Sequence, residues 1–135
     1  MIAKIVSLLL LAGIAVFDVE ASPCSGINRS IDASRKAELA GPIAAQLKTD
    51  HVTVLSSMGF KDWSIIYVET PGSDPPFLFF KGNPDKTHYM TLWSGAATIY
   101  EEQAIKQWTL ENAPGIPERL AVCFAWSVTQ TQRDQ

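Results

Sequence analysis

The chain has 135 residues with 11 basic and 14 acidic side chains, a formal net charge of −3, and 47% hydrophobic residues. A nearly balanced charge without a basic block excludes the electrostatic surface by which nucleic-acid-binding proteins hold phosphates. The length suits one domain better than two. We therefore expect a single folded domain and no nucleic-acid partner.

Residues 1–21 have the three parts of a cleavable secretory signal. Met1–Lys4 is short and positively charged, Ile5–Phe17 is an unbroken apolar run, and Val19–Ala21 places small residues at the −3 and −1 positions. The run is shorter than the about 20 apolar residues that span a bilayer. We predict export to the periplasm or the outside, and a mature domain, residues 22–135, without a stable membrane anchor. The alternative is an unprocessed chain with a buried N-terminal helix.

Cys24 and Cys123 are the two cysteines of the chain. In an oxidising compartment, two cysteines most simply form a disulfide, which would close a loop of most of the domain. The alternatives are a metal pair, which needs clustered Cys and His residues that neither cysteine has nearby, and a reactive thiol. Cys24 follows Pro23, well after the apolar run, and this argues against a lipid-modified cysteine. We predict the Cys24–Cys123 disulfide.

The first element expected after the signal is a helix over residues 33–47. Ser30 or Asp32 can cap its start by accepting hydrogen bonds from free backbone N–H groups. Apolar residues then recur at helical spacing along it. Gly41-Pro42 lies inside this pattern, and we predict a kink or a restart of the helix there.

The middle of the chain changes to the alternating pattern of strands. Four strands are expected between turn residues, over residues 51–58, 63–70, 77–80 and 89–93. In the first, Val52, Val54 and Ser56 should share one face of the sheet. The proline-rich loop Pro71–Pro76 cannot join a ladder of hydrogen bonds. The fourth strand can continue towards Ala97.

The last part of the chain turns helical again. Tyr100–Asn112 carries apolar residues at helical spacing, and Pro114–Pro117 ends that helix. Leu120–Val128 is either a short helix or a last strand. Consecutive strands joined by short turns pair antiparallel. The sequence therefore predicts an α+β fold: an N-terminal helix, a four-stranded antiparallel sheet with helices on one face, a C-terminal helix and tail, and one disulfide.

Several residues stand in an order that resembles a loosely defined set of small exported bacterial α+β proteins of unknown function. The matching segments are Arg35–Leu39, Val52–Leu55, Asp62-Trp63 with Pro71, Trp108, and Ile116–Leu120. The longer leader with Cys24, and Cys123 itself, depart from that pattern. The resemblance implies a fold, and it carries over no catalytic residue because those proteins have no assigned function.

Side chains that could catalyse a reaction are present but are not spaced for it. His51 and His88 stand far apart, without HxxxH or HExxH spacing, so no metal site is predicted. Ser94 lacks the GxSxG context of a nucleophile elbow. Glu69 and Asp74 could form a glycosidase-like pair only across a loop.

Glu101 and Glu102 are the one adjacent pair of carboxylates among these candidates. Neighbouring positions on a helix diverge by about 100°, so the two side chains cannot face one substrate. Capping and the favourable interaction with the helix dipole explain them better. The sequence therefore indicates no catalytic residue and no cofactor, and it leans against an enzyme.

Binding is the function that the sequence favours. Phe77–Phe80 is apolar on both faces of its strand, so helices on one face alone would leave aromatic rings exposed to a partner. The alternative is that both faces are covered. The residues proposed for binding are Asp74, Phe77, Phe79, Asp85, His88, Tyr89 and Trp93. We expect an exported non-enzymatic binding protein, such as an inhibitor or immunity-type protein, with an envelope or secreted protein as its partner. Asp74 and Asp85 would then enter a cationic site on that partner.

The alternative function is a small-ligand-binding or enzymatic domain with an aromatic-lined pocket between a helix and a curved sheet. Its lining would be Trp63, Tyr67, Phe79, Tyr89 and Trp93, with His88 or Glu69 as the polar group. A deep pocket with converging polar groups favours this alternative. A filled core with protruding loops favours the binding protein.

Overall fold

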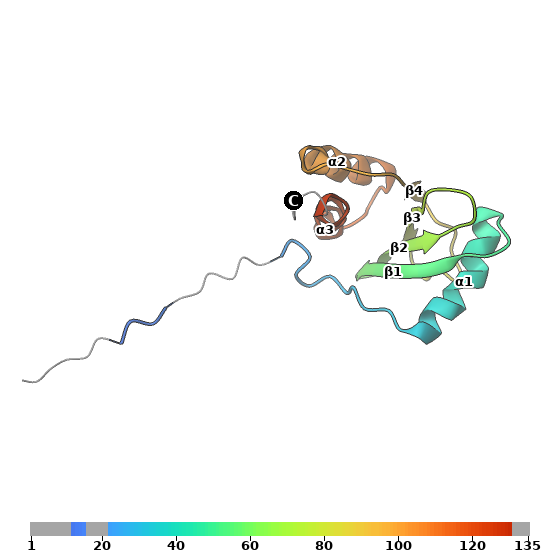
Figure 1. The fold of residues 1–135 in the computed structure, drawn as a ribbon, viewed down its shortest axis with the longest axis horizontal. Helices are drawn as coiled ribbons and strands as arrows, with labels where there is room; N and C mark the ends of the chain where they lie inside the picture. Colours follow the sequence, from blue (N-terminus) through green and yellow to red (C-terminus); the bar gives the residue numbers. More distant parts are fainter. Residues whose placement is uncertain (1–11, 16–21, 131–135) are drawn as a thin grey trace, which may run out of the picture.

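The computed structural model describes residues 12–15 and 22–130, so most of the expected export segment lies outside the described residues. The elements follow in the order α1 (Ala33–Leu47), β1 (Thr53–Phe60), β2 (Trp63–Glu69), β3 (Phe77–Lys81), β4 (Thr91–Trp93), a 3-10 turn η1 (Ile99–Glu101), α2 (Glu102–Asn112) and α3 (Glu118–Thr129). Figure 1 shows the sheet between α1 on one side and α2 and α3 on the other. Among the described residues, no helix is both long and apolar enough to cross a lipid bilayer.

Helix α1 begins at the cap that the sequence predicts. The Asp32 side chain accepts a hydrogen bond of 2.7 Å from the backbone N–H of Arg35, which satisfies a free donor of the first turn. The helix then runs through Gly41-Pro42 as one element, so the predicted restart does not occur. A residue with a Cβ is crowded by a following proline in helical conformation, and Gly41 has no Cβ.

The four strands form a meander in the order β1-β2-β3-β4, and every neighbouring pair is antiparallel. The register of β1 against β2 shifts between Val54 and Ser56, which leaves Leu55 as the extra residue of a bulge. Val54 therefore packs on the α1 side, whereas Met58 packs on the side of α3. The prediction that Val54 and Ser56 share a face is wrong, because the bulge reverses the alternation between them.

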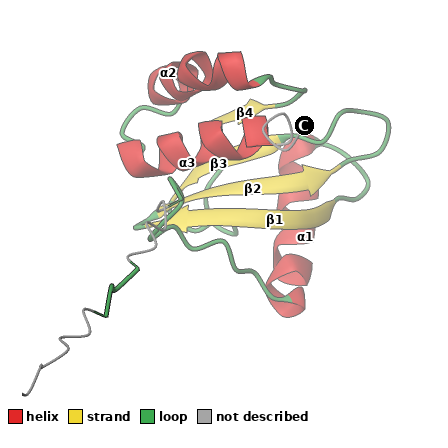
Figure 2. Ribbon diagram, turned by 60° about the vertical axis from the view of Figure 1, so that its left-hand side comes forward, coloured by secondary structure: helices red, strands yellow, loops and turns green. Residues whose placement is uncertain are grey.

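Both faces of the sheet are buried, so the alternative that both faces are covered is confirmed and the expectation of helices on one face is wrong. Successive residues of the two central strands, such as Ile65 and Ile66 or Phe79 and Phe80, are at most 1% exposed. Side chains of α1 cover one face, and side chains of α2 and α3 cover the other. An apolar residue at every position of a strand requires such cover on both sides, and Figure 2 shows helices on both sides of the strands.

Residues 120–128, for which the sequence leaves helix and strand open, are helical and belong to α3. Lys106 of α2 and Glu118 of α3 join the two helices through a 2.9 Å ion pair. The hydrogen bond from Lys106 lowers the pKa of the exposed Glu118 carboxyl.

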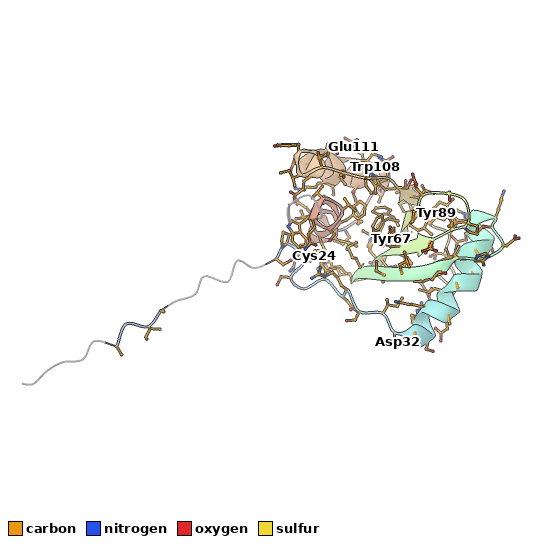
Figure 3. The ribbon with its side chains drawn as sticks, viewed as in Figure 1. Cys24, Asp32, Tyr67, Tyr89, Trp108 and Glu111 are labelled. Carbon is orange, nitrogen blue, oxygen red and sulfur yellow. A yellow bond between two sulfur atoms is a disulfide. The ribbon has the colours of Figure 1, made fainter. Side chains whose placement is uncertain are left out.

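The predicted disulfide is confirmed. Cys24 and Cys123 are bonded, with their Cα atoms 4.6 Å apart, and both are buried in the cluster between the sheet and α3. Figure 3 shows Cys24 next to α3, and Asp32 at the start of α1. The bond thus ties the segment that precedes α1 to the last helix of the chain.

Candidate functional site

A solvent-open hollow of about 520 Å³ lies between the first turns of α1 and the sheet face that α1 covers. We call it the α1 hollow. Its polar lining residues are Asn28, Ser30, Asp32, Arg35, Ser57, Lys61, Asp62, Ser64 and Asn83, and its apolar wall includes Ile31, Leu39 and Ile66. Its volume falls within the range of about 300–1,000 Å³ that is usual for small-molecule sites.

The hollow exists because this end of the sheet carries small residues on the α1 side. Gly59 pairs with Ser64, and Ser57 pairs with Ile66, so all four share the face that α1 covers. Farther along the same face, Val68 and larger side chains fill the space below α1. Three small residues near the β1–β2 turn therefore leave the floor of the hollow unfilled.

Arg35 forms a fixed wall of the hollow. Its guanidinium donates hydrogen bonds of 2.8 Å to Asp85, 3.1 Å to Glu38 and 3.0 Å to the Asn83 side chain. The bond to Asp85 is the main reason why the pKa of Arg35 is raised above its ordinary value. Asp85, predicted to enter a cationic site of a partner, is therefore engaged within its own chain.

The hydroxyl of Ser64 lies at the floor of the hollow and has no hydrogen-bond partner among the described residues. Its oxygen is buried. A buried hydroxyl without a partner costs about 1–3 kcal/mol of folding free energy. Such a cost in a hollow marks a position at which a ligand group could be received.

The lining of the hollow has no net formal charge. Arg35 and Lys61 supply two positive charges, and Asp32 and Asp62 supply two negative ones. The remaining polar groups are hydroxyls and amides, which both donate and accept hydrogen bonds. This arrangement suits a neutral polar ligand better than an anion or a cation.

Two of the predicted binding residues lie at the other end of the sheet. Asp74 is exposed in the loop between β2 and β3 and lines two hollows, one with Leu92 and one with Phe77 and Gly95. The Phe77 ring is half-buried and stacks on Tyr67, with 4.2 Å between the ring centroids. Asp74 and Phe77 are therefore brought together next to the 94–97 segment.

Four other predicted binding residues do not form one common surface, although Trp93 contacts Phe77 with 6.0 Å between ring centroids and the rings of His88 and Tyr89 lie 4.3 Å apart. Phe79 is fully buried between the sheet and α3, so it is a core residue instead of a binding residue. Trp93 packs half-buried on that same side, whereas Tyr89 packs on the α1 side. His88 is exposed and its Nδ1 donates a 2.7 Å hydrogen bond to the Tyr89 carbonyl oxygen.

The aromatic residues expected to line one pocket lie on both faces of the sheet. Trp63, Phe79 and Trp93 belong to the cluster on the α2 and α3 side of the sheet, and Tyr89 belongs to the opposite side. The sheet itself separates these rings, because neighbouring positions of a strand point to opposite faces.

The carboxylates considered for catalysis have other environments. Glu101 accepts a 2.7 Å hydrogen bond from the backbone N–H of Thr98 and so caps η1. Glu69 is exposed at the end of β2, and His51 is exposed just before β1. Within residues 12–15 and 22–130, no three His, Cys, Asp or Glu side chains are grouped to hold a metal ion.

The α1 hollow was not among the sites predicted from the sequence. The signal was a run of small residues on one strand face, Ser57 and Gly59, followed across the turn by Ser64. Only the register of β1 against β2 shows that these three small residues lie on the same face of the sheet. Arg35 and Asp62 stood in the pattern of the resemblance, but nothing in their spacing joined them into a site.

Comparison with known proteins adds no relative to this description. No protein-family model matches the chain, and neither a curated protein nor a solved structure does. The resemblance to small exported bacterial proteins therefore stays a prediction.

Proposed function

We propose that the chain is an exported, non-enzymatic binding protein whose partner is an envelope or secreted protein. The observation that carries this proposal is a set of exposed apolar side chains on the edge strand β4 and on the segment that follows it. The large apolar side chains of Met90, Leu92, Ile99 and Tyr100 are 43%, 39%, 39% and 89% exposed. Met90 and Leu92 lie at β4, whereas Ile99 and Tyr100 lie in η1 and border α2 and α3. All four fall within residues 89–100, a segment without any charged residue. We call this segment the apolar edge.

The apolar edge differs from the opposite edge of the sheet. On β1, the backbones of Asn28 and Gly59 exchange two hydrogen bonds of 2.8 and 2.7 Å, and the bulge at Leu55 interrupts the strand. Both features hinder the addition of another strand. On β4, no strand of the described residues pairs with the outer side, and no charge protects it. β4 is only three residues long, so an added strand would pair chiefly with Thr91–Trp93 and the residues next to them. Its outer side has no other protection among the described residues against strand addition from another chain.

The proposed partner presents an extended, uncharged and apolar segment. Charged groups on such a segment would lose water at the apolar edge without gaining an ion pair there. The loop that contains Asp74 borders the edge, because Asp74 shares a hollow with Leu92 and Ser94. Asp74 then meets a polar or basic group at the rim of the interface, where charges favour correct orientation more than affinity.

Export is supported by residues 1–21 and by the buried disulfide, since disulfides persist mainly in oxidising compartments. Protein recovered from the periplasm or the medium should begin at Ser22 when its N-terminus is sequenced. Recovery of a chain that still begins at Met1 would contradict the export proposal.

The partner is tested by capture from envelope extracts with immobilised residues 22–135. We expect one dominant captured protein, and we expect Leu92→Lys to reduce its recovery at least about tenfold, because an edge lysine must be desolvated in the added strand. Thr53→Lys is the matched control, since Thr53 is exposed on the opposite edge strand.

Two results would overturn this proposal. One is equal recovery of the captured protein by the wild-type chain and by Leu92→Lys. The other is a stable dimer of residues 22–135 in sedimentation equilibrium that Leu92→Lys converts to a monomer, because the apolar edge would then be covered by a second copy.

A further inference from the structure

We propose that the α1 hollow is a second binding site, one that takes a small, neutral, hydroxyl-rich ligand such as a sugar. It shares no residue with the apolar edge. The inference therefore stands independently of the proposed protein partner, and each can fail without the other.

The chemistry of the lining selects this class of ligand. Ser30, Ser57 and Ser64 supply hydroxyls, and Asn28 and Asn83 supply side-chain amides. Hydroxyls and amides combine donor and acceptor in one group, which is what a ligand with several hydroxyls requires. Ile31, which is half-buried, gives the hollow an apolar wall against which the C–H groups of a sugar ring can pack.

Anions are disfavoured although an arginine and a helix start are present. The guanidinium of Arg35 is already bonded to the carboxylates of Asp85 and Glu38 at 2.8 and 3.1 Å. The first turn of α1 is capped by the carboxylate of Asp32, which would repel an incoming anion. In the rest of the lining, the positive charge of Lys61 is offset by the negative charge of Asp62.

Ser64 is the residue that favours a binding site over a surface depression without function. Its buried oxygen has no partner within residues 22–130, and its side chain can turn among three staggered positions. Because that oxygen is closed to solvent in its present rotamer, a ligand hydroxyl would supply the missing hydrogen bond only after the Ser64 side chain turns toward the hollow. The folding cost of Ser64 in the free protein would then be recovered in the complex.

Binding is tested by titrating isotope-labelled residues 22–135 with glucose, N-acetylglucosamine, a trisaccharide of N-acetylglucosamine and inorganic phosphate, while amide signals are recorded by NMR. We expect saturable shifts at Gly59, Ser64 and Asn83 with the sugars, and no saturable shift there with phosphate. Tighter binding of the trisaccharide indicates a glycan chain as the source, and equal binding indicates a free sugar.

Two variants separate binding from stability. Ser64→Ala removes one oxygen without adding bulk, so we expect a higher midpoint of urea unfolding together with roughly tenfold weaker sugar binding, the loss of about one hydrogen bond. Ser57→Leu fills the hollow and should abolish the shifts, whereas Ser34→Leu, at an exposed position of α1 outside the lining, should leave them unchanged.

Three results would overturn the proposed site. The first is the absence of a saturable shift in the hollow with any of the three sugars. The second is stronger binding of phosphate than of sugars at the same amides. The third is unchanged sugar affinity in Ser64→Ala, which would leave the unpaired hydroxyl without a role in binding.

Discussion

Gln46, on the last turn of α1, shows how one polar side chain holds a loop of this protein in place. Its side-chain nitrogen donates a 2.9 Å hydrogen bond to the Thr87 carbonyl, and its oxygen accepts one of 2.9 Å from the Tyr89 backbone N–H. Together with the bonds of Arg35 to Asn83 and Asp85, it fastens the β3–β4 connection along α1. The wall of the α1 hollow depends on this connection.

Replacing Gln46 by Ala should lower the free energy of unfolding by about 1–3 kcal/mol, because the Tyr89 N–H loses its partner in a half-buried place. Urea unfolding followed by circular dichroism measures this loss. Gln107→Ala is the matched control, since Gln107 is exposed on α2 and bonds only to Glu111 of its own helix. A loss of equal size in both variants would contradict the role of Gln46.

Helix α1 borders both candidate surfaces, because its first turns line the α1 hollow and Leu47 in its last turn shares a hollow with Leu92. Its apolar stripe of Leu39, Ile43 and Ala44 fixes it on the sheet, while its first turns overhang the α1 hollow. The helix keeps Pro42 in its interior, which removes a backbone donor and costs stability. Gly41 makes this proline tolerable, because no Cβ meets the proline ring.

Whether Gly41→Ala stabilises or destabilises the protein should therefore depend on whether residue 42 is proline or alanine. In the wild-type chain we expect destabilisation, since the new Cβ faces the proline ring. In the background of Pro42→Ala we expect stabilisation by about 0.5–1 kcal/mol, because alanine favours the helix and the added Cβ otherwise meets open space.

A double-mutant cycle of thermal unfolding measures the coupling between the two substitutions. Gly72→Ala is a control for conformation alone, since its Cβ also meets open space but its φ is +71°; it should destabilise in either background. The same effect of Gly41→Ala in both backgrounds would contradict the explanation of the continuous helix.

For the whole molecule, the Cys24–Cys123 disulfide is the longest-range covalent constraint, with a sequence separation of 99 residues. It holds the leader against α3, and the leader in turn pairs with β1 through Asn28 and Gly59. One covalent bond thus joins the layer of α2 and α3 to the segment that leads into α1.

Reduction of this bond should lower the free energy of unfolding by up to about 4.7 kcal/mol, the chain-entropy value for a loop of about 100 residues. Urea unfolding with and without dithiothreitol measures the loss. The same reagent should have no effect on the double variant Cys24→Ala, Cys123→Ala. In the denatured, unreduced wild-type protein, titration should find no free thiol, and two free thiols would contradict the bond.

The candidate binding residues were only partly predictable. Asp74 and Phe77 lie together because they are close in the sequence, on either side of one loop end. Phe79 is two residues farther along β3 and was expected at a surface, but α2 and α3 cover its face of the sheet. Strand alternation alone does not tell which faces are covered.

Local patterns in the sequence determined the elements and the covalent link. The Asp32 cap, the helical spacing up to Leu47, the prolines of the β2–β3 loop and the count of two cysteines each act through neighbouring residues or through composition. Their outcomes are the bounds of α1, the antiparallel meander and the disulfide. Such signals do not depend on how the elements pack.

The tertiary structure alone decided which side each element covers and where space remains. Only the pairing of β1 with β2 reveals the bulge at Leu55, which turns Val54 and Met58 to opposite faces. Only the packing of α2 and α3 fixes residues 120–128 as helix. The α1 hollow arises because folding brings three small strand residues under α1. A linear pattern records that a position is small or apolar, but the space around it is set by residues distant in the sequence.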